Sequence, residues 1–334
     1  MQTSGSGPVA SGPVALALDF GGTKVESALV DGAGRLLPGS RFRAPTGPSA
    51  SSEGLWESVA SVLDAALAAV GDRELIGVGI GTAGPIDERA GLVSPLNVPQ
   101  WRGFPFRDRV VEWLRDRATP APVTLRMDGL AITLADHWIG AAGGVDNVMG
   151  MVVSTGIGGG LILGGATVSG PTGNAGHIGH IEVGGFDVRC ACGGTGCVEA
   201  VASGPRSVAW ARSQGWTGNS GEQLATAYTA GDAIARAAVR RAGTAIGRAI
   251  ASAAALTDLE VVAVGGGFSR VSPDLFGFIR EAIDERAEFG FVKKVQVVPS
   301  GLSDEGPLIG AAALIHRAAV VTGSAEPQPL GSST

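Results

Sequence analysis

Residues 14–24 read VALALDFGGTK, and this stretch decides the fold class. Its almost continuous apolar run, closed by an acid and a Phe, predicts a buried strand. Gly21 and Gly22 predict a turn, after which residues 25–31 and 35–44 predict two more strands. The chain therefore opens with strand, glycine turn and strand, and no helix follows the first turn.

The second half of the chain repeats this opening. Residues 147–154 predict a strand, 155–160 a glycine turn and 161–164 another strand. Helices are predicted over 55–70, 106–118, 129–140, 200–213, 223–229, 233–256, 273–288 and 304–321, and further strands over 75–80, 123–126, 261–264 and 295–299. This alternation predicts an α/β protein with partly parallel sheets.

Two copies of one opening predict two related lobes with a cleft between them. We expect a smaller N-terminal lobe of residues 14–127 completed by 303–322, and a larger lobe of residues 128–302. The ends of the chain, 1–13 and 323–334, are rich in small and polar residues and predict a disordered leader and tail.

Composition limits the partners. The 334 residues are 45% hydrophobic and carry a net charge of -6, with three lysines and no basic run, so nucleic acid is not an expected partner. The longest uncharged stretch, 147–181, is too rich in Gly to span a membrane, and the start lacks the features of a signal peptide. We expect a cytoplasmic protein.

The first glycine turn has the composition of an anion site. Gly21 and Gly22 let backbone N–H groups approach an anion, and the Thr23 hydroxyl can donate to a phosphate oxygen. Asp19 can hold a hydrated Mg²⁺ beside the phosphates. An ordinary hairpin turn is the alternative interpretation.

Two further glycine-rich stretches follow strands: STGIGGG at 154–160 and VGGGF at 264–268. One glycine turn alone is weak support for a phosphate site, but three such turns indicate one nucleotide contacted by three loops. The stretch at 79–84 matches GxGxxG but opens no helix, which argues against a dinucleotide site.

The strongest local signal is a set of three cysteines and a histidine: His180, Cys190, Cys192 and Cys197. An odd number of cysteines in one short segment argues against a disulfide framework. Three thiolates and one imidazole complete a tetrahedral set for a structural Zn²⁺ with no open position. Three free thiols are the alternative.

Two carboxylates are candidates for the chemistry. Asp128 follows a predicted strand and starts a helix, where an Asp is commonly an N-cap, but it could also be a general base for phosphoryl transfer. Glu199, two residues after Cys197, is either a surface acid or a ligand-binding group held by the zinc loop.

Together these motifs resemble the ROK family of sugar kinases, whose fold is similar to that of hexokinase and actin. The resemblance covers residues 14 to about 321 and rests on three motifs: DFGGTK at 19–24, STGIGGG at 154–160 (Ser for the family's first Gly), and HIEV at 180–183 followed by CACGGTGCVE at 190–199. It implies a two-lobed, ribonuclease H-like α/β fold with a structural zinc loop.

The family's activity is transfer of the γ-phosphate of ATP·Mg²⁺ to a sugar hydroxyl, and the family is often dimeric. By resemblance Asp128 is the catalytic base, and Glu199 and His180 contact the sugar. Gly84, Met127 and His177 complete the substrate-binding candidates. The nucleotide candidates are Asp19, Gly21, Gly22, Thr23, Lys24, Thr155, Gly156, Gly266 and Gly267.

Two positions depart from the family pattern. Met127 stands where the family has an Asn that bonds the sugar, and His177 stands where it has a Glu that accepts sugar hydroxyls. Met offers no useful hydrogen bond, and a neutral His is a weaker acceptor than a carboxylate. We therefore expect poor use of plain glucose.

Three hypotheses follow. The first is a kinase for a modified sugar or a sugar-like C7-cyclitol, as in antibiotic pathways, acting on the equivalent of the 6-OH. The second is an ordinary glucokinase or other hexose kinase. The third is a non-catalytic sugar sensor. ROK repressors carry an N-terminal helix-turn-helix, and 13 residues precede the first predicted strand, so we do not expect a DNA-binding regulator.

Overall fold

The computed structural model describes residues 12–286, 288–302 and 304–323. They form two compact units. The first contains residues 12–126 and Pro307–His316, and the second contains the chain from Met127 to Gly306 and from Arg317 onward. The predicted leader and tail lie outside the described residues, apart from residues 12, 13 and 323. None of the described helices combines the length and apolar character needed to cross a bilayer.

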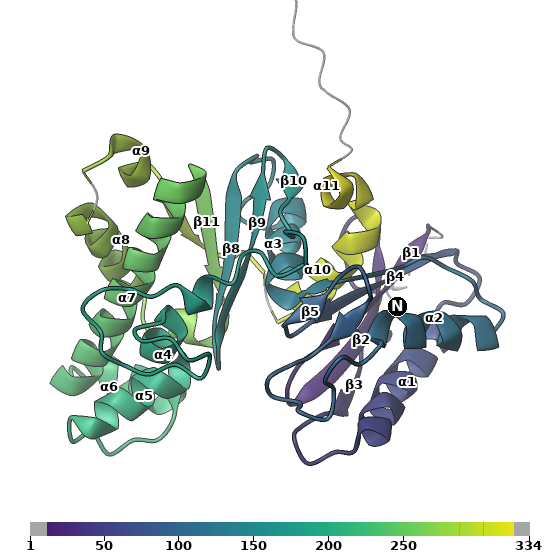
Figure 1. Cartoon of the computed structure of the whole chain (residues 1–334), viewed down its shortest axis with the longest axis horizontal. Coiled ribbons are helices and arrows are strands. Elements are labelled where there is room, and N and C mark those ends of the chain that lie inside the picture. Colours follow the sequence, from purple (N-terminus) through teal and green to yellow (C-terminus); the bar gives the residue numbers. More distant parts are fainter. Residues whose placement is uncertain (1–11, 287, 303, 324–334) are drawn as a thin grey trace, which may run out of the picture. The chain divides into compact units, whose positions relative to one another are not determined.

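The first unit is built on a five-stranded sheet in the order β3-β2-β1-β4-β7 (Figure 1). Its strands are β1 (Val14–Phe20), β2 (Lys24–Asp31), β3 (Phe42–Pro45), β4 (Leu75–Thr82) and β7 (Val123–Met127). β1 pairs antiparallel with β2 and parallel with β4, as the opening hairpin and a later crossover require. A short hairpin of β5 (Ile86–Asp87) and β6 (Leu92–Val93) follows β4.

Three helices cover this sheet: α1 (Ser52–Ala68), α2 (Phe106–Asp116) and α10 (Gly306–His316). α10 lies directly against β4, because a Cβ added to Gly79 would stand 1.8 Å from the carbonyl oxygen of Ala311. Phe20 at the end of β1 stacks on Trp101 at 4.5 Å and meets the edge of Phe106, and all three rings are buried. This aromatic cluster supports the turn that follows β1.

The second unit repeats the design with a sheet in the order β10-β9-β8-β11-β12. Its strands are β8 (Val148–Val153), β9 (Ile157–Leu163), β10 (Ala166–Thr167), β11 (Val261–Gly265) and β12 (Gln296–Pro299). β8 pairs antiparallel with β9 and parallel with β11, as β1 does with β2 and β4. The predicted repeat of the opening hairpin is therefore confirmed.

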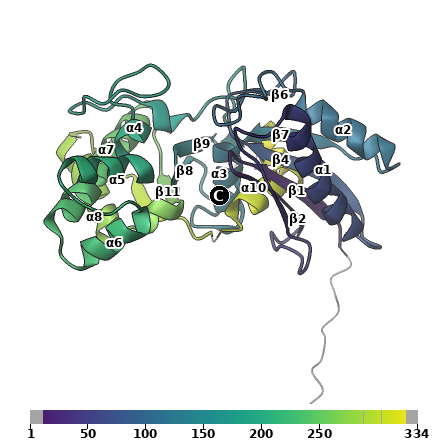
Figure 2. The ribbon, with the colours of Figure 1, turned by 90° about the horizontal axis from the view of Figure 1, so that it is seen from below.

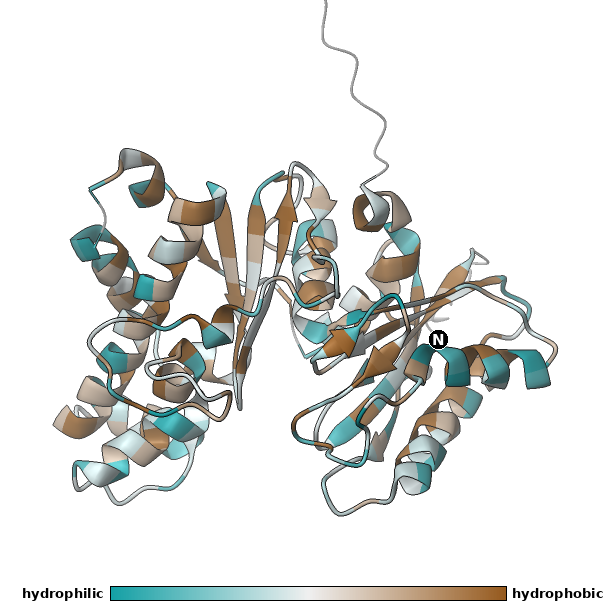
Figure 3. Ribbon diagram, viewed as in Figure 1, coloured by the Kyte–Doolittle hydropathy of each residue, from teal (hydrophilic) through white to brown (hydrophobic). Residues whose placement is uncertain are grey.

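Helices lie on both faces of the second sheet (Figures 1 and 2). They are α3 (Asp128–Ile139), α4 (Val198–Ala202), α5 (Gly204–Ser213), α6 (Gly221–Thr229), α7 (Ala233–Thr257), α8 (Asp274–Arg286), α9 (Gly290–Lys293) and α11 (Ala318–Thr322). Met149, Met151 and Val153 of β8 join one core with α7, whereas Gly150 lies against Thr133 of α3. Figure 3 shows hydrophobic residues along the strands of this sheet.

Four local predictions were wrong. The glycine turn expected over 155–160 ends early, because β9 begins at Ile157. The helix expected over 200–213 is two helices that meet at Ser203, whose backbone is extended. The last helix, expected to run unbroken to 321, ends at His316 and resumes as α11 beyond Arg317. Within 35–44, the strand β3 starts only at Phe42.

Candidate functional site

The first glycine turn is held closely by its own backbone and by Thr46. The Gly21 amide donates to the Lys24 carbonyl at 2.9 Å, and the Thr46 hydroxyl donates to the Gly21 carbonyl at 2.7 Å. A Cβ on Gly22 would lie 2.9 Å from the Cβ of Asn97, a neighbour for which the sequence pattern carried no signal. The turn is thus preformed, and Thr23 at its tip is exposed.

Charged groups beside the turn form a local network. The Lys24 ammonium pairs with the buried carboxylate of Glu26, which also accepts from Arg41 with its Nη2 at 3.1 Å. Asp19, half-buried at the end of β1, stands opposite Glu26 in the β1–β2 register. Lys24 was expected to bind the nucleotide. In the structure its positive charge is already balanced by Glu26.

The second and third glycine turns lie side by side in the second unit. The Ser154 amide donates to the Gly156 carbonyl at 2.9 Å. Gly266 adopts φ 94°, and a Cβ there would stand 2.5 Å from the Val153 carbonyl oxygen. Only Gly fits this approach of backbone to backbone. The candidates Thr155, Gly156, Gly266 and Gly267 are therefore brought together.

A cavity of about 660 Å³ opens beside these two turns. Ser154, Thr155, Gly267 and Phe268 line one part of it. The rest is lined mainly by α5 and α6, with the apolar side chains of Val208 and Ala225 and the charged Arg212, Glu222 and Arg270. This size is typical of small-ligand and cofactor sites, and the lining combines apolar side chains with polar and charged groups.

Asp128 occupies the first turn of α3 but is not its cap. Met127 stands at the N-cap position, with extended backbone and no capping bond, and its side chain is buried. The N-cap interpretation of Asp128 is therefore wrong. Its Oδ1 accepts from the Gly129 amide at 2.7 Å, and burial raises the pKa of Asp128 to about 6 against the lowering effect of that amide. Such a carboxylate is ionised at neutral pH and basic enough to take a proton.

Close backbone packing fixes the start of α3. A Cβ on Gly129 would lie 2.4 Å from the Gly159 carbonyl oxygen, and one on Gly160 would lie 2.5 Å from the Cα of Leu130. The glycines of β9 therefore admit α3 against the sheet, and Gly159 and Gly160 are not part of a phosphate turn. The run GIGGG at 156–160 therefore has two roles. Its first residues belong to the turn, and its last glycines allow α3 to pack against the sheet.

Glu199 reaches the turn at the start of β9. Its Oε2 accepts from the Ile157 amide at 2.8 Å. His177 is half-buried nearby, with its ring 5.7 Å from that of His180. Burial and the neighbouring His180 lower the pKa of His177, and Glu199 acts in the opposite direction. We infer a neutral imidazole at pH 7.

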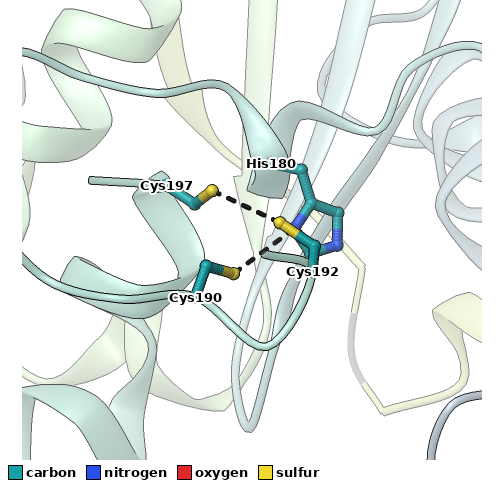
Figure 4. A group of neighbouring side chains, drawn as sticks. All are labelled: His180, Cys190, Cys192 and Cys197. Atoms are coloured by element: carbon teal, nitrogen blue, oxygen red, sulfur yellow. Dashed lines mark hydrogen bonds between the residues drawn. The ribbon is translucent and has the colours of Figure 1, made fainter. Parts of the chain in front are cut away.

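The cysteine–histidine set converges as predicted (Figure 4). The ligand atoms of His180, Cys190, Cys192 and Cys197 all lie within 4.8 Å of one another. The Cys190 Sγ is 3.7 Å from His180 Nδ1, and the Cys192 and Cys197 sulfurs are 3.6 Å apart. Tetrahedral Zn²⁺ with bonds of about 2.3 Å to sulfur and 2.0 Å to nitrogen requires separations of about 3.6–3.8 Å. The donor set fits zinc.

The remaining candidate, Gly84, lies in the first unit beyond the end of β4 and is half-buried. The candidate residues thus fall into two sets. One set is carried by the first unit: Asp19, Gly21, Gly22, Thr23, Lys24 and Gly84. The other is carried by the second unit: Met127, Asp128, Thr155, Gly156, His177, His180, Glu199, Gly266, Gly267 and the three cysteines.

Comparison with known proteins identifies relatives that match most of the chain. The ROK family model matches residues 15–318. Glucokinase from Thermotoga maritima is 30% identical over 90% of this chain and 96% of its own. N-acetylmannosamine kinase from Escherichia fergusonii is 33% identical over 75% of this chain and 82% of its own.

A solved structure is similar over nearly the whole chain. It is a ROK family glucokinase from Streptomyces griseus in complex with glucose and AMPPNP, with a TM-score of 0.76 and 29% identity over 91% of this chain and 99% of that one. The sequence match, the hexokinase-like α/β fold and the cysteine–histidine set agree. This chain belongs to the ROK family.

Proposed function

We propose that this ROK sugar kinase, a phosphotransferase with an alcohol group as acceptor, uses ATP to phosphorylate the primary hydroxymethyl oxygen of a modified sugar or sugar-like C7-cyclitol in a secondary-metabolite pathway. The observation that carries the proposal is Asp128. It is a half-buried carboxylate at the start of a helix fixed by glycine packing, with a pKa raised by burial to about 6. Nucleotide and sugar in the Streptomyces griseus relative support a donor and an acceptor of these classes.

The proposed chemistry is a direct in-line transfer. Asp128 takes the proton of the acceptor hydroxyl, the acceptor oxygen forms a bond to the γ-phosphorus, and the bond from that phosphorus to the bridging oxygen of ADP breaks. Thr23, Thr155 and the turn amides donate to phosphate oxygens and stabilise the charge. Mg²⁺, when bound, would neutralise part of the phosphate charge. Its protein ligand would be Asp19, a carboxylate at the end of β1.

The donor nucleotide is assigned to the cavity of about 660 Å³ in the second unit. Its turns at Thr155 and Gly267 supply amide donors for phosphates, and the apolar side chains of α5 and α6 suit a base. Glu199 and the neutral His177 are assigned to the acceptor.

The acceptor class rests on the two altered positions. Met127 is 3% exposed, and its thioether offers an acceptor no useful hydrogen bond. His177 supplies an imidazole in place of a carboxylate. A hydroxyl left without its partner costs about 1–3 kcal/mol, so an acceptor that keeps both hydroxyls of glucose at these points is disfavoured.

A zinc ion at the cysteine–histidine set would hold in place the segment that carries Glu199, a proposed contact of the acceptor. Because Cys197 immediately precedes α4, the metal would fix the chain two residues before Glu199. A closed set of four ligands leaves no position for water, so zinc would act as a structural ion.

The test is release of ADP with ATP and Mg²⁺ against an acceptor panel. The panel holds glucose, mannose, their amino and N-acetyl forms, fructose and C7-cyclitols, with Asp128→Asn as the control. Turnover of a modified sugar or cyclitol with little turnover of glucose is the expected result. Efficient turnover of glucose would establish an ordinary hexose kinase. Sugar binding without turnover of any acceptor would establish a sensor.

A further inference from the structure

α4 is too short to hold its own position. It spans Val198–Ala202, and a helix of this length has no stability without tertiary contacts. Yet Glu199, whose carboxylate must keep its bond to the Ile157 amide, lies on it. The N-terminal end is fixed by Cys197, the N-cap residue and a member of the zinc set. The C-terminal end of α4 packs Val201 and Ala202 into the core and also has a polar anchor from a side chain of α7.

Arg241 of α7 provides that anchor. Its Nη1 donates to the Val201 carbonyl, in the last turn of α4, at 2.6 Å. A cation at the C-terminal end of a helix is also favoured by the helix dipole. The guanidinium is half-buried, and burial lowers the pKa of Arg241. No carboxylate pairs with it anywhere in the described parts of the chain, so its partners are this carbonyl and two aromatic rings.

The same guanidinium contacts the zinc loop. It stacks over Phe186, 5.2 Å from the ring centre, and lies 5.4 Å from the ring of Trp210. Arg248, two turns further along α7, stacks on the same Phe186 ring at 5.6 Å and donates to the Gly184 carbonyl at 2.5 Å. Arg248 therefore holds the loop alone, whereas Arg241 holds both the loop and α4.

We propose that Arg241 is a positioning residue for the acceptor: it fixes α4 from its C-terminal end and thereby places the carboxylate of Glu199. Cation–π contacts with Phe186 and Trp210 hold the guanidinium, whose Nη1 donates to the Val201 carbonyl. Arg241 touches neither substrate and acts through Glu199. The inference rests on the proposed function, because it assigns Glu199 to the acceptor.

The test compares Arg241→Met with Arg248→Met by calorimetric titration of wild type and variants with the acceptor that the panel identifies. Arg241→Met keeps most of the side-chain length and removes the donor. We expect its acceptor dissociation constant to rise about tenfold, as for other groups that orient a ligand-binding side chain. Affinity for MgATP and zinc content should stay at wild-type values. Arg248→Met, which loses the same stacking partner but no bond to α4, should bind the acceptor like wild type.

Two further variants make the test decisive. In a Glu199→Gln background, Arg241→Met should add little, because the carboxylate it positions is gone. Arg241→Lys, which keeps a charge and a donor, should bind with intermediate affinity and serves if Arg241→Met does not fold. Equal effects of Arg241→Met and Arg248→Met, loss of zinc, or full additivity with Glu199→Gln would overturn the proposal. Wild-type protein that phosphorylates no acceptor would instead refute the proposed function.

Discussion

In the first unit, β1 and β2 are joined by a turn whose glycines stand at its tip, and Gly22 packs against Asn97. In the second unit, β8 and β9 are joined in the same topology, but the glycine run continues into the strand. There Gly159 and Gly160 admit α3 against the sheet. The first opening uses Gly22 to admit the side chain of Asn97 against the turn, and the second uses its glycines mainly to bring a helix close.

This difference explains where the proposed chemistry lies. The helix admitted by the second opening begins with Asp128, whereas the first opening brings no helix to its turn. In the proposed mechanism, the first unit contributes phosphate contacts and the metal-side Asp19. The second unit contributes the proposed base, the proposed acceptor contacts and the cavity assigned to the nucleotide.

The largest expected effect follows from this division. Asp128→Asn should lower the turnover number by about 10²–10⁴-fold, the usual contribution of general base catalysis. The binding of acceptor and MgATP should stay close to wild type, because the substitution keeps the size of the side chain. Steady-state kinetics and calorimetry measure both. Asp146→Asn, an exposed acid in the same unit, is the control. Near-normal turnover of Asp128→Asn would show that Asp128 is not the base, and that the second unit does not supply the base through α3.

Loss of the zinc set should act on the second unit alone. Purified protein should contain stoichiometric zinc, and Cys192→Ser should release it and destabilise the loop before Glu199 by several kcal/mol. Metal analysis and thermal unfolding are the measurements. Ala191→Ser, which adds a hydroxyl one residue away, should keep zinc and stability. Protein that lacks zinc and is equally stable without it would refute the metal assignment.

Substitutions within one strand test the packing role of glycine directly. A Cβ at Gly159 would stand 2.6 Å from the Gly150 carbonyl oxygen, so Gly159→Ala should cost about 1–3 kcal/mol of unfolding free energy. Gly158→Ala meets no atom within 4 Å and should change stability by less than about 0.5 kcal/mol. Urea titration compares the two variants. Equal losses of stability in the two variants would show that Gly159 has no special packing role in the second unit.

The turn of the first unit offers the matching experiment. A Cβ at Gly21 would make an ordinary contact of 3.4 Å with the Lys24 carbonyl oxygen, so Gly21→Ala should fold with little loss of stability. It should raise the KM for MgATP, because the methyl group stands where a phosphate approaches the amides. An unchanged KM would mean that this turn does not contact the nucleotide.

The smallest effect concerns pH. Burial raises the pKa of Asp128 to about 6, so the base is protonated and inactive below that pH and ionised above it. The value of kcat/KM should therefore rise as the pH increases through about 6, by about tenfold per unit on the acid side. The profile of an Asp128→Glu variant should show a shifted acid limb. A wild-type profile that is flat from pH 5 to 7 would contradict the assignment.

Much of the fold was predictable because its signals are local. Continuous apolar runs such as residues 14–20 mark buried strands, and the spacing of Cys190, Cys192 and Cys197 marks a metal set. The dual use of GIGGG was not predictable, since a glycine that opens a turn and one that admits a helix look alike in sequence. The pairing of Lys24 with Glu26 and the bond from Arg241 to α4 depend on tertiary packing, which periodicity does not encode.

We propose a kinase with an intact base and an altered acceptor site, and the sharpest test is to return both altered positions to the residues of the family. The measurement is kcat/KM for glucose in wild type and in the double variant Met127→Asn with His177→Glu. Asn is also a preferred residue at the N-cap position that Met127 occupies, so the variant should fold. Two restored contacts of about 1–3 kcal/mol each predict a gain of at least about tenfold for glucose. No gain, or a wild type that already prefers glucose, would contradict the account.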